Sequence, residues 1–324
     1  MRFLSAEDVR KSLPMKQAID TMRDAFVQLS MNQAVVPLRL GIDIPEHNGG
    51  ALFMPVYLPK NKQVGLKVVS VFKNNPEKGL PMIYAMVIVM DAVNGCPLAV
   101  MDGEYLTALR TGAASGLATD LLSRKDAEVV TIIGAGVQGK TQLEAVCAVR
   151  SIKKAYILDI DLQRATEFAK EMSERLSIPV DLIEKSEMLR QSYVICTATS
   201  SHDPVFSDND LKPGVHINGI GSYRPDMQEI PVETIVRAKV VVDSKESCLS
   251  EAGDIIIPLQ EGIIDENHIY AEIGEIAAGN KIGRESREEI TVFKSVGNAV
   301  QDLAAASRVI ETARVQNIGI EISL

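Results

Sequence analysis

Residues 128–159 constrain the fold more than any other part of this 324-residue chain. A run of β-branched residues at 129–133 leads directly into the motif GAGVQG at 134–139, and a helical pattern and a second apolar strand follow. The first glycine of such a motif allows the turn off the strand, the second lets the backbone approach a pyrophosphate, and the third lets the helix pack against the sheet. The free N–H groups at the helix start attract phosphate. The segment therefore predicts a strand–turn–helix unit that binds a dinucleotide.

Asp159 indicates which dinucleotide is bound. It lies twenty residues after Gly139, at the expected end of the second strand, where a carboxylate accepts the ribose hydroxyls. The same carboxylate repels a 2′-phosphate. The sequence therefore favours NAD(H), with NADP(H) as the second possibility. Lys153 and Lys154 precede the strand and are expected to face solvent.

Composition excludes several classes of partner. The net charge is −9, which argues against nucleic acid or an anionic membrane surface as a partner. No apolar run approaches the ~20 residues of a membrane span, and the start of the chain lacks the apolar segment of a signal peptide. The four cysteines are widely spaced and form no CxxC pair. We expect a reduced, cytoplasmic protein.

Two patterns of periodicity divide the chain. After a helical stripe that begins near Pro14, short apolar segments separated by Asn, Gly and Pro turns predict an antiparallel sheet. Its expected strands are 35–44, 51–59, 63–73, 82–92 and 96–102. Residues 104–122 then read as a helix with many small side chains, which suits close packing between domains or beneath a ligand.

From residue 128 to about 244, strands alternate with helices, as in a doubly wound parallel sheet. The expected strands are 128–133, 155–159, 180–183, 193–198, 215–220 and 239–243. A helical tail is expected at 295–314, and a last apolar segment at 318–322 is a candidate strand. The predicted fold class is thus α/β, a Rossmann sheet together with a second α+β domain that contains the antiparallel sheet.

Four polar residues are candidates for chemistry. Arg39 lies among apolar residues on a predicted strand, and Lys67 points to the opposite face from Leu66 and Val68. Arg110 is a single cation in the small-residue helix, and Asp226 follows a glycine-rich strand end, where open α/β sheets bind ligands. Each also has an ordinary structural interpretation, as a solvent-facing or paired charge or a turn residue.

Motifs for other chemistries are missing from the sequence. The four histidines show no spacing typical of metal ligands, and HExxH, paired CxxC and GxSxG motifs do not occur. We therefore expect no metal. An enzyme of this kind would rely on its cofactor for the difficult chemistry, while the protein supplies orientation and charge.

Five motifs resemble the ornithine cyclodeaminase/μ-crystallin family, in the family's order and over nearly the whole chain. They are DGEYLTALRTGAAS from Asp102, IGAGVQG from Ile133, GSYRPD from Gly221, EAGD from Glu251 and SVGN from Ser295. The resemblance implies a substrate-binding and dimerisation domain formed by 1–118 and 300–324, with an NAD(P)-binding Rossmann domain inserted at 119–299. It also implies a homodimer.

The resemblance further implies roles for particular residues. Arg39 and Arg110 would hold the substrate carboxylate, for which the planar fork of arginine is suited. Lys67 would bind substrate and polarise the reacting C=N or C=O group, and Asp226 would exchange a proton with the amine. The residues expected to contact the cofactor are Thr111, Gly134, Gly136, Val137, Gln138, Gly139, Asp159, Thr197, Ala198, Thr199, Ser295, Val296, Gly297 and Asn298.

The chemistry implied by the family is hydride transfer at a carbon that bears both nitrogen and a carboxylate. We expect an NAD(P)H-dependent oxidoreductase of a small α-imino or α-amino acid, of the Δ1-pyrroline-2-carboxylate/ketimine reductase or alanine dehydrogenase type. One alternative is ornithine cyclodeaminase, although Met82 stands where cyclodeaminases often have Thr. The other is a non-catalytic, μ-crystallin-like NAD(P)H-binding protein. The side chain of the substrate, the direction of the reaction and the pathway stay open.

Overall fold

The computed structural model describes residues 1–323, and the chain divides into two compact units. Unit 1 comprises Met1–Arg110 and Ala299–Leu324, and unit 2 comprises Thr111–Asn298. The first boundary lies inside helix α3 (Gly103–Leu122), the helix that also contains the boundary expected at residue 118. The α/β prediction, with a Rossmann-type parallel sheet and a separate antiparallel sheet, is confirmed.

Unit 1 is built on a seven-stranded sheet of order β15-β1-β6-β5-β4-β3-β2. The five expected strands are present and pair antiparallel in sequence order, while β1 joins β6 in parallel. The strands are β1 (Arg2–Leu4), β2 (Leu40–Ile44), β3 (Gly49–Leu58), β4 (Gln63–Phe72), β5 (Ile83–Asp91), β6 (Pro97–Asp102) and β15 (Ile320–Glu321). The expected strand at 35–44 is shorter than predicted, so Arg39 immediately precedes β2 and does not lie on it.

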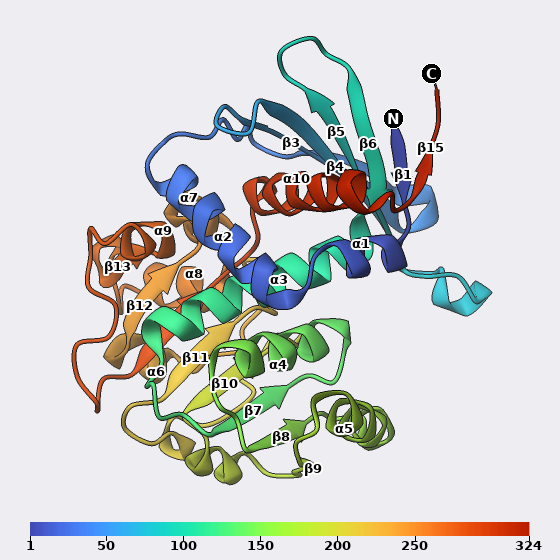
Figure 1. Ribbon diagram of the computed structural model, residues 1–324. Coiled ribbons are helices and arrows are strands. Elements are labelled where there is room, and N and C mark those ends of the chain that lie inside the picture. Colours follow the sequence, from blue (N-terminus) through green and yellow to red (C-terminus); the bar gives the residue numbers. More distant parts are fainter. Residues whose placement is uncertain (324) are drawn as a thin grey trace. The chain divides into compact units, whose positions relative to one another are not determined.

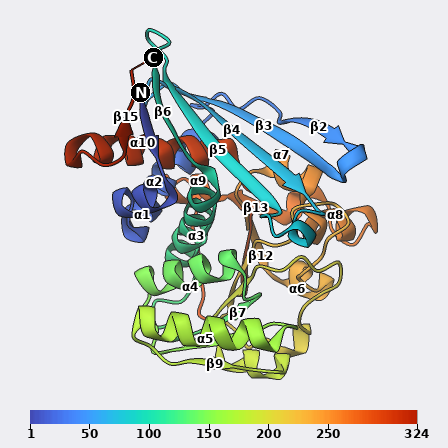
Figure 2. The same ribbon diagram turned by 90° about the vertical axis from the view of Figure 1, so that its right-hand side faces the viewer.

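Helices cover one face of this sheet. The helices of unit 1 are α1 (Ala6–Ser12), α2 (Met15–Ser30) and α10 (Ala299–Gln316), with short 3₁₀ turns η1 (Pro45–His47) and η2 (Pro76–Lys78). Helix α10 packs against α2 and against β3, β4 and β5 (Figures 1 and 2). A Cβ atom on Gly65 of β4 would lie 2.8 Å from Leu303 of α10, so the glycine lets the helix lie close to the sheet. Lys67, two residues further along the strand, points to the same face.

Unit 2 is built on eight parallel strands of order β13-β12-β14-β11-β10-β7-β8-β9. Their bounds are β7 (Val129–Ile133), β8 (Lys154–Leu158), β9 (Val180–Leu182), β10 (Val194–Thr197), β11 (His216–Gly219), β12 (Lys239–Val242), β13 (Ile269–Glu272) and β14 (Thr291–Lys294). The helical tail expected at 295–314 begins only at Ala299, because residues 295–298 form a loop after β14. Strands β13 and β14 were not predicted; they lie beyond residue 244, where the predicted alternation of strands and helices ends.

The helices of unit 2 connect these strands. They are α4 (Val137–Val149), α5 (Leu162–Leu176), α6 (Val232–Arg237), α7 (Lys245–Glu251), α8 (Gly253–Gln260) and α9 (Ile273–Ala277), with 3₁₀ turns η3 (Ser186–Gln191), η4 (Asp208–Asp210) and η5 (Glu266–His268). The small-residue helix α3 lies close to α4, because a Cβ on Gly112 would stand 2.6 Å from the carbonyl oxygen of Thr141. The core consists mainly of Val, Ile and Leu from the parallel strands.

The strand order of unit 2 determines where a ligand is expected to bind, namely at the carboxyl ends of two neighbouring strands. After β7 the chain adds β8 and β9 on one side, and it then returns to add β10 and β11 on the other. Ligands of open α/β sheets bind at the carboxyl ends of the strands, where the order reverses. In this chain that point lies between β7 and β10 (Figure 1).

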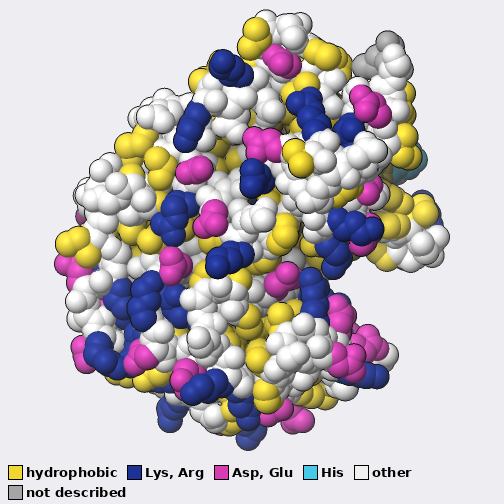
Figure 3. Space-filling view, viewed as in Figure 1, with side chains coloured by type: hydrophobic (Ala, Val, Ile, Leu, Met, Phe, Trp, Pro, Cys, Tyr) yellow, Lys and Arg dark blue, Asp and Glu magenta, His cyan; other side chains and the backbone are white. Residues whose placement is uncertain are grey.

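Charge is distributed without a continuous basic patch on the face shown in Figure 3, where cations and carboxylates are interspersed. The net charge of the whole chain is −9. None of the helices within residues 1–323 has the length and apolar character that crossing a membrane requires.

Candidate active site

The glycine motif forms the turn from β7 into α4. Gly134 has φ +107°, which side chains rarely adopt, and a Cβ there would lie 2.5 Å from the carbonyl oxygen of Ala198. A Cβ on Gly139 would lie 2.1 Å from the carbonyl oxygen of Gly134. Gly136 is different, because its Cβ would meet no atom within 4 Å. Gly134 and Gly139 thus close the turn. Gly136 leaves space over the helix N-terminus, and this space fits a pyrophosphate.

Asp159 lies just beyond β8 and is bound to this turn. Its Oδ2 accepts a hydrogen bond from the N–H of Ala135 at 2.6 Å, and its Oδ1 accepts one from the N–H of Asp161. Arg164, which sequence reasoning did not select, donates to Oδ1 at 2.7 Å. Burial opposes ionisation of Asp159, but the hydrogen bonds from Arg164 and the backbone outweigh it and lower the pKa of the carboxyl. The acid expected to meet the ribose is therefore ionised.

Three further segments that were predicted to contact the cofactor lie at the carboxyl ends of strands or at the start of α4. Thr197 ends β10, with Ala198 and Thr199 directly after it, and the segment 295–298 follows β14. Val137 and Gln138 occupy the first turn of α4. The Oε1 atom of Gln138 is buried and accepts no hydrogen bond from the described residues, so it is available to a ligand. The predicted residue Thr111 lies buried in α3.

Asp243, immediately after β12, holds the segment 295–298 in place. Its Oδ2 accepts hydrogen bonds from the Ser295 hydroxyl at 2.7 Å and from the N–H groups of Val296 and Gly297 at 3.1 and 2.8 Å. The Asp243 side chain is completely buried. A buried carboxylate that accepts backbone N–H groups gives a loop one defined conformation.

Asp226, the predicted proton-exchanging group, lies on the loop after β11. Its carboxylate is half exposed and accepts two hydrogen bonds from Arg224, at 3.1 and 3.0 Å. The ring of His202 contacts the Asp226 carbonyl oxygen at 2.6 Å. The carboxylate is therefore accessible to solvent.

In unit 1 the structure brings Lys67 and Arg110 together on one carboxylate. The Nζ atom of Lys67 lies 2.7 Å from Oδ2 of Asp302, and Nε of Arg110 lies 3.1 Å from Oδ1 of the same residue. Nη1 of Arg110 donates to Oε1 of Gln301 at 2.9 Å. All four side chains are buried. The third predicted cation, Arg39, lies close enough for its charge to act on Lys67.

The environment of Lys67 changes its acidity. Burial lowers the pKa of the Lys67 ammonium to about 8; the charges of Arg110 and Arg39 act in the same direction, and Asp302 opposes them. An ammonium with such a pKa can hold or release a proton near neutral pH. The cluster therefore offers guanidinium groups for a carboxylate and a proton-bearing amine beside them.

Asp302 and Asp243 are the functional candidates that sequence reasoning missed. Asp302 is a single acid in the otherwise mainly apolar segment 299–306, and Asp243 directly follows an apolar strand; these positions are the signals that point to them. A buried acid requires a partner, but the partner's identity comes only from the fold. Within residues 1–323 there is no group of three His, Cys, Asp or Glu side chains placed to hold a metal ion.

Comparison with known proteins gives one consistent result. The model of the ornithine cyclodeaminase/mu-crystallin family matches residues 1–317. A Δ1-pyrroline-2-carboxylate reductase from Bacillus cereus is 40% identical, over 98% of this chain and 98% of its own. The Thermococcus litoralis Δ1-pyrroline-2-carboxylate reductase, solved with NADH and L-proline, is 46% identical with a TM-score of 0.95, over 99% of this chain and all of its own. An archaeal alanine dehydrogenase dimer with bound NAD is 37% identical, with a TM-score of 0.93, and covers 100% of this chain and 99% of its own.

The glycine turn leads to a prediction that separates binding from folding. We expect Gly136→Ala to leave the melting temperature unchanged but to weaken NADH binding at least about tenfold, because a methyl group would occupy the space left for the pyrophosphate. Gly139→Ala should lower the melting temperature even without ligand, because its Cβ would press on the carbonyl of Gly134. Differential scanning fluorimetry and NADH fluorescence titration measure the two effects. Unchanged NADH affinity in the Gly136 variant would contradict this assignment.

Proposed function

The chain belongs to the ornithine cyclodeaminase/mu-crystallin family, and we propose that it is an NADH-dependent reductase of a small cyclic α-imino acid, with Δ1-pyrroline-2-carboxylate as the favoured substrate. The observation that carries the proposal is the buried cluster in which Lys67 and Arg110 share Asp302. Two relatives named Δ1-pyrroline-2-carboxylate reductase, 40% and 46% identical over nearly the whole chain, support the choice of substrate. The bound NADH and NAD in the two solved structures support the cofactor.

In this proposal the residues of unit 1 bind the substrate. Arg39 and Arg110 would form charge-assisted hydrogen bonds with the carboxylate, which orients the adjacent carbon. Lys67 would direct its ammonium group at the C=N group and polarise it. Asp302 keeps this ammonium charged, and because it also binds Arg110 it fixes the spacing of the two cations.

The residues of unit 2 complete the proposal. The turn at 134–139 and the segments 197–199 and 295–298 would bind the dinucleotide, with Thr111 and Asp159. When bound, the nicotinamide supplies the hydride that the imine carbon accepts. The imine nitrogen gains a proton, and Asp226 would exchange it; the accessibility of its carboxylate on the loop after β11 supports this role. General acid–base help of this kind contributes roughly 10²- to 10⁴-fold.

We propose NADH as the preferred reductant because the ionised Asp159 would repel a 2′-phosphate. Arg164 beside it is a cation that would tolerate that phosphate, so NADPH is a second reductant to be measured. We also propose the reducing cytoplasm as the compartment. The four cysteines are free, and burial raises the pKa of the Cys196 thiol to about 12, so that thiol is unreactive.

A substrate panel tests the function. We expect oxidation of NADH, followed at 340 nm, with Δ1-pyrroline-2-carboxylate, and slower or no oxidation with pyruvate plus ammonia. Asp226→Ala should lower kcat by about 10²-fold or more and leave the NADH dissociation constant within twofold of wild type. Production of proline and ammonia from ornithine with NAD⁺ would instead identify a cyclodeaminase. NADH binding without turnover on any imine would identify a non-catalytic binding protein.

The acidity of Lys67 gives a pH prediction. If the charged ammonium is the active form, kcat/KM falls above pH about 8, where Lys67 loses its proton. Asp302→Asn removes the opposite charge, so the pKa of Lys67 falls further and this alkaline limb moves to lower pH by about one unit or more. The matched control is Glu311→Gln on the same helix, whose exposed pair with Arg308 has no part in the cluster. An alkaline limb that stays in place in the Asp302 variant would exclude this role.

We further propose that the chain forms a homodimer through the uncovered face of the seven-stranded sheet. This face is opposite to the one covered by α10, and it exposes the large apolar side chains of Leu40, Ile42, Tyr57, Tyr84 and Met86. A contiguous apolar patch of this kind marks an interaction surface. A second copy is the occupant we favour, because the 37% identical alanine dehydrogenase was solved as a dimer.

Charge placed on this face should separate the subunits. We expect Met86→Glu combined with Ile42→Glu to convert the dimer to a monomer in sedimentation velocity experiments, because burying two carboxylates without partners costs several kcal/mol. Val315→Glu is the control, since Val315 is an exposed apolar residue of α10 and lies away from this face. A dimer that persists in the double variant at micromolar concentration would place the interface elsewhere.

A further inference from the structure

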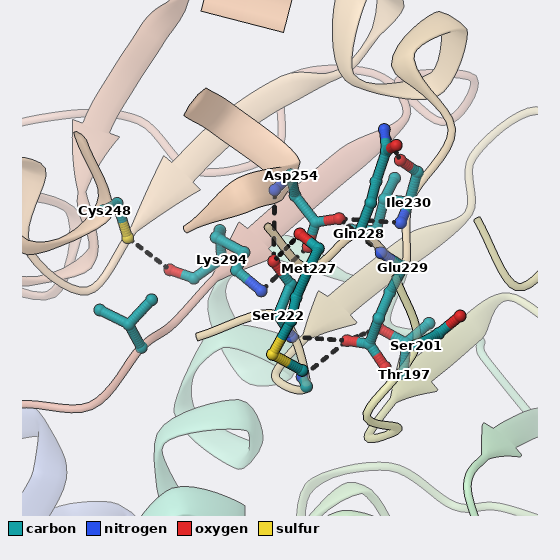
Figure 4. A network of polar contacts seen from close by, with 12 residues as sticks. Thr197, Ser201, Ser222, Met227, Gln228, Glu229, Ile230, Cys248, Asp254 and Lys294 are labelled. Atoms are coloured by element: carbon teal, nitrogen blue, oxygen red, sulfur yellow. Dashed lines mark hydrogen bonds and ion pairs between the residues drawn. The ribbon is translucent and has the colours of Figure 1, made fainter. Parts of the chain in front are cut away.

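Glu229 joins two of the loops at the carboxyl edge of the sheet of unit 2. Its Oε1 accepts hydrogen bonds from the N–H and the hydroxyl of Thr199, at 2.6 and 2.8 Å. Its Oε2 accepts bonds from the Thr197 hydroxyl at 2.9 Å and from the N–H groups of Gly221 and Ser222 at 2.6 and 3.2 Å. One completely buried carboxylate therefore connects the loop after β10 with the loop after β11 (Figure 4).

Two further buried charges support Glu229. Oδ1 of Asp254 accepts the N–H groups of Glu229 and Ile230 at 2.7 and 2.9 Å, and Oδ2 lies 2.9 Å from Nζ of Lys294 (Figure 4). Lys294 ends β14, directly before the segment 295–298. The network thus reaches a third strand end, and its single ammonium offsets part of the charge of two carboxylates.

The same network holds the segment that carries Asp226. The hydroxyl of Ser222 donates to the carbonyl oxygen of Met227 at 2.8 Å, which closes the loop on either side of Asp226. A Cβ on Gly253, in the motif EAGD, would lie 1.9 Å from that same carbonyl. A Cβ on Gly221 would lie 2.1 Å from the carbonyl of Thr199. The backbone at both glycines therefore packs too closely on these carbonyls for any side chain to fit.

The hydrogen bonds identify the ionised form of Glu229 as the one that fits. Burial raises the pKa of the Glu229 carboxyl, and the charge of Lys294 opposes this increase. Each carboxylate oxygen accepts a backbone N–H, from Thr199 on one side and from Gly221 on the other. A glutamine at this position would, in either orientation of its side-chain amide, direct the amide N–H groups at one of these two backbone N–H groups.

We propose that Glu229 is a positioning residue for hydride transfer, whose carboxylate fixes the loop that carries Thr197 and Thr199 relative to the loop that carries Asp226. Thr197 and Thr199 are expected to contact the dinucleotide, and Asp226 is expected to exchange the proton. Glu229 touches neither substrate nor cofactor in this role. The inference rests on the proposed function, because it assigns Glu229 through these three residues.

The test is Glu229→Gln, which preserves the shape of the side chain but replaces one of its two acceptor oxygens with an NH₂ group. We expect kcat per NADH-binding site to fall about 10- to 100-fold, because small displacements of reacting groups have effects of this size. With NADH deuterated at C4, the isotope effect should be at least as large as in wild type, which would place the lost rate in hydride transfer. Thr197→Val is a milder second variant that removes one donor to Oε2, and it should lower kcat several-fold.

Asp210→Asn is the matched control. Asp210 is a buried carboxylate of the same unit that accepts bonds from Ser186 and from the N–H of Ser207, in turns that precede β10 and β11. Its variant should lower the melting temperature while kcat and the isotope effect stay at wild-type values. If Glu229 had only a structural role, its variant would likewise have a lower melting temperature and a wild-type kcat and isotope effect. A wild-type kcat and isotope effect in both Glu229→Gln and Thr197→Val would overturn the inference.

A second readout separates failure of this inference from failure of the proposed function. The dissociation constant of NADH needs no imine substrate, and it should rise in Glu229→Gln, by up to about tenfold, and stay constant in Asp210→Asn. If wild type reduces no imine, the proposed function fails while this comparison still measures whether Glu229 holds the loop after β10. An unchanged NADH affinity together with an unchanged kcat would remove Glu229 from the site altogether.

Discussion

The ion pair of Lys67 and Arg110 with Asp302 is the interaction on which the proposed chemistry depends. Burial costs each of the two cations several kcal/mol of hydration free energy, and the carboxylate of Asp302 offsets part of this cost. The charge of Arg39 also acts on Lys67. Asp302 carries one negative charge against the two positive charges of Lys67 and Arg110. The excess positive charge is the reason that an anionic substrate group is expected to bind here, and it adds to the effect of burial that makes the ammonium of Lys67 acidic.

Buried carboxylates have a related task in unit 2. Asp243, Glu229 and Asp254 have their oxygens directed at backbone N–H groups of loops that follow different strands. Such loops have no regular backbone pairing of their own, so a charged acceptor is an effective way to give them one conformation. The glycines at 221 and 253 permit the close approach that these contacts require. The parallel sheet is held by its regular backbone hydrogen bonds, and the loops at its carboxyl edge are held by the three buried carboxylates.

Membership of the family does not define the substrate, because members with this fold act on different substrates; individual residues determine which substrate is bound. The relatives compared above are named as a reductase of a cyclic imine and as a dehydrogenase of an amino acid, and they share this fold. Met82 lies exposed just before β5 and gives no polar contact to a diamine. This agrees with a reductase better than with a cyclodeaminase.

Much of the fold follows from local patterns. The alternation of apolar residues predicted the antiparallel strands, and the strand–glycine–helix segment predicted β7, α4 and β8 with their turn. Strands β13 and β14 were missed, because they lie beyond residue 244, where the regular alternation of strands and helices in the sequence ends. Arg39 was placed on a strand that begins one residue later, since propensity locates the ends of elements poorly.

The sequence by itself determined the residue types that can turn at Gly134, cradle a phosphate at Gly136 and carry charge at Lys67, Arg110 and Asp226, because these are properties of single residues and their near neighbours. Only the tertiary structure decided which charges meet. Asp302 lies 192 positions from Arg110, and Glu229 binds residues of two separate strand ends. Such partners are selected by the packing of a helix on a sheet and by strand order, and local sequence contains no record of either.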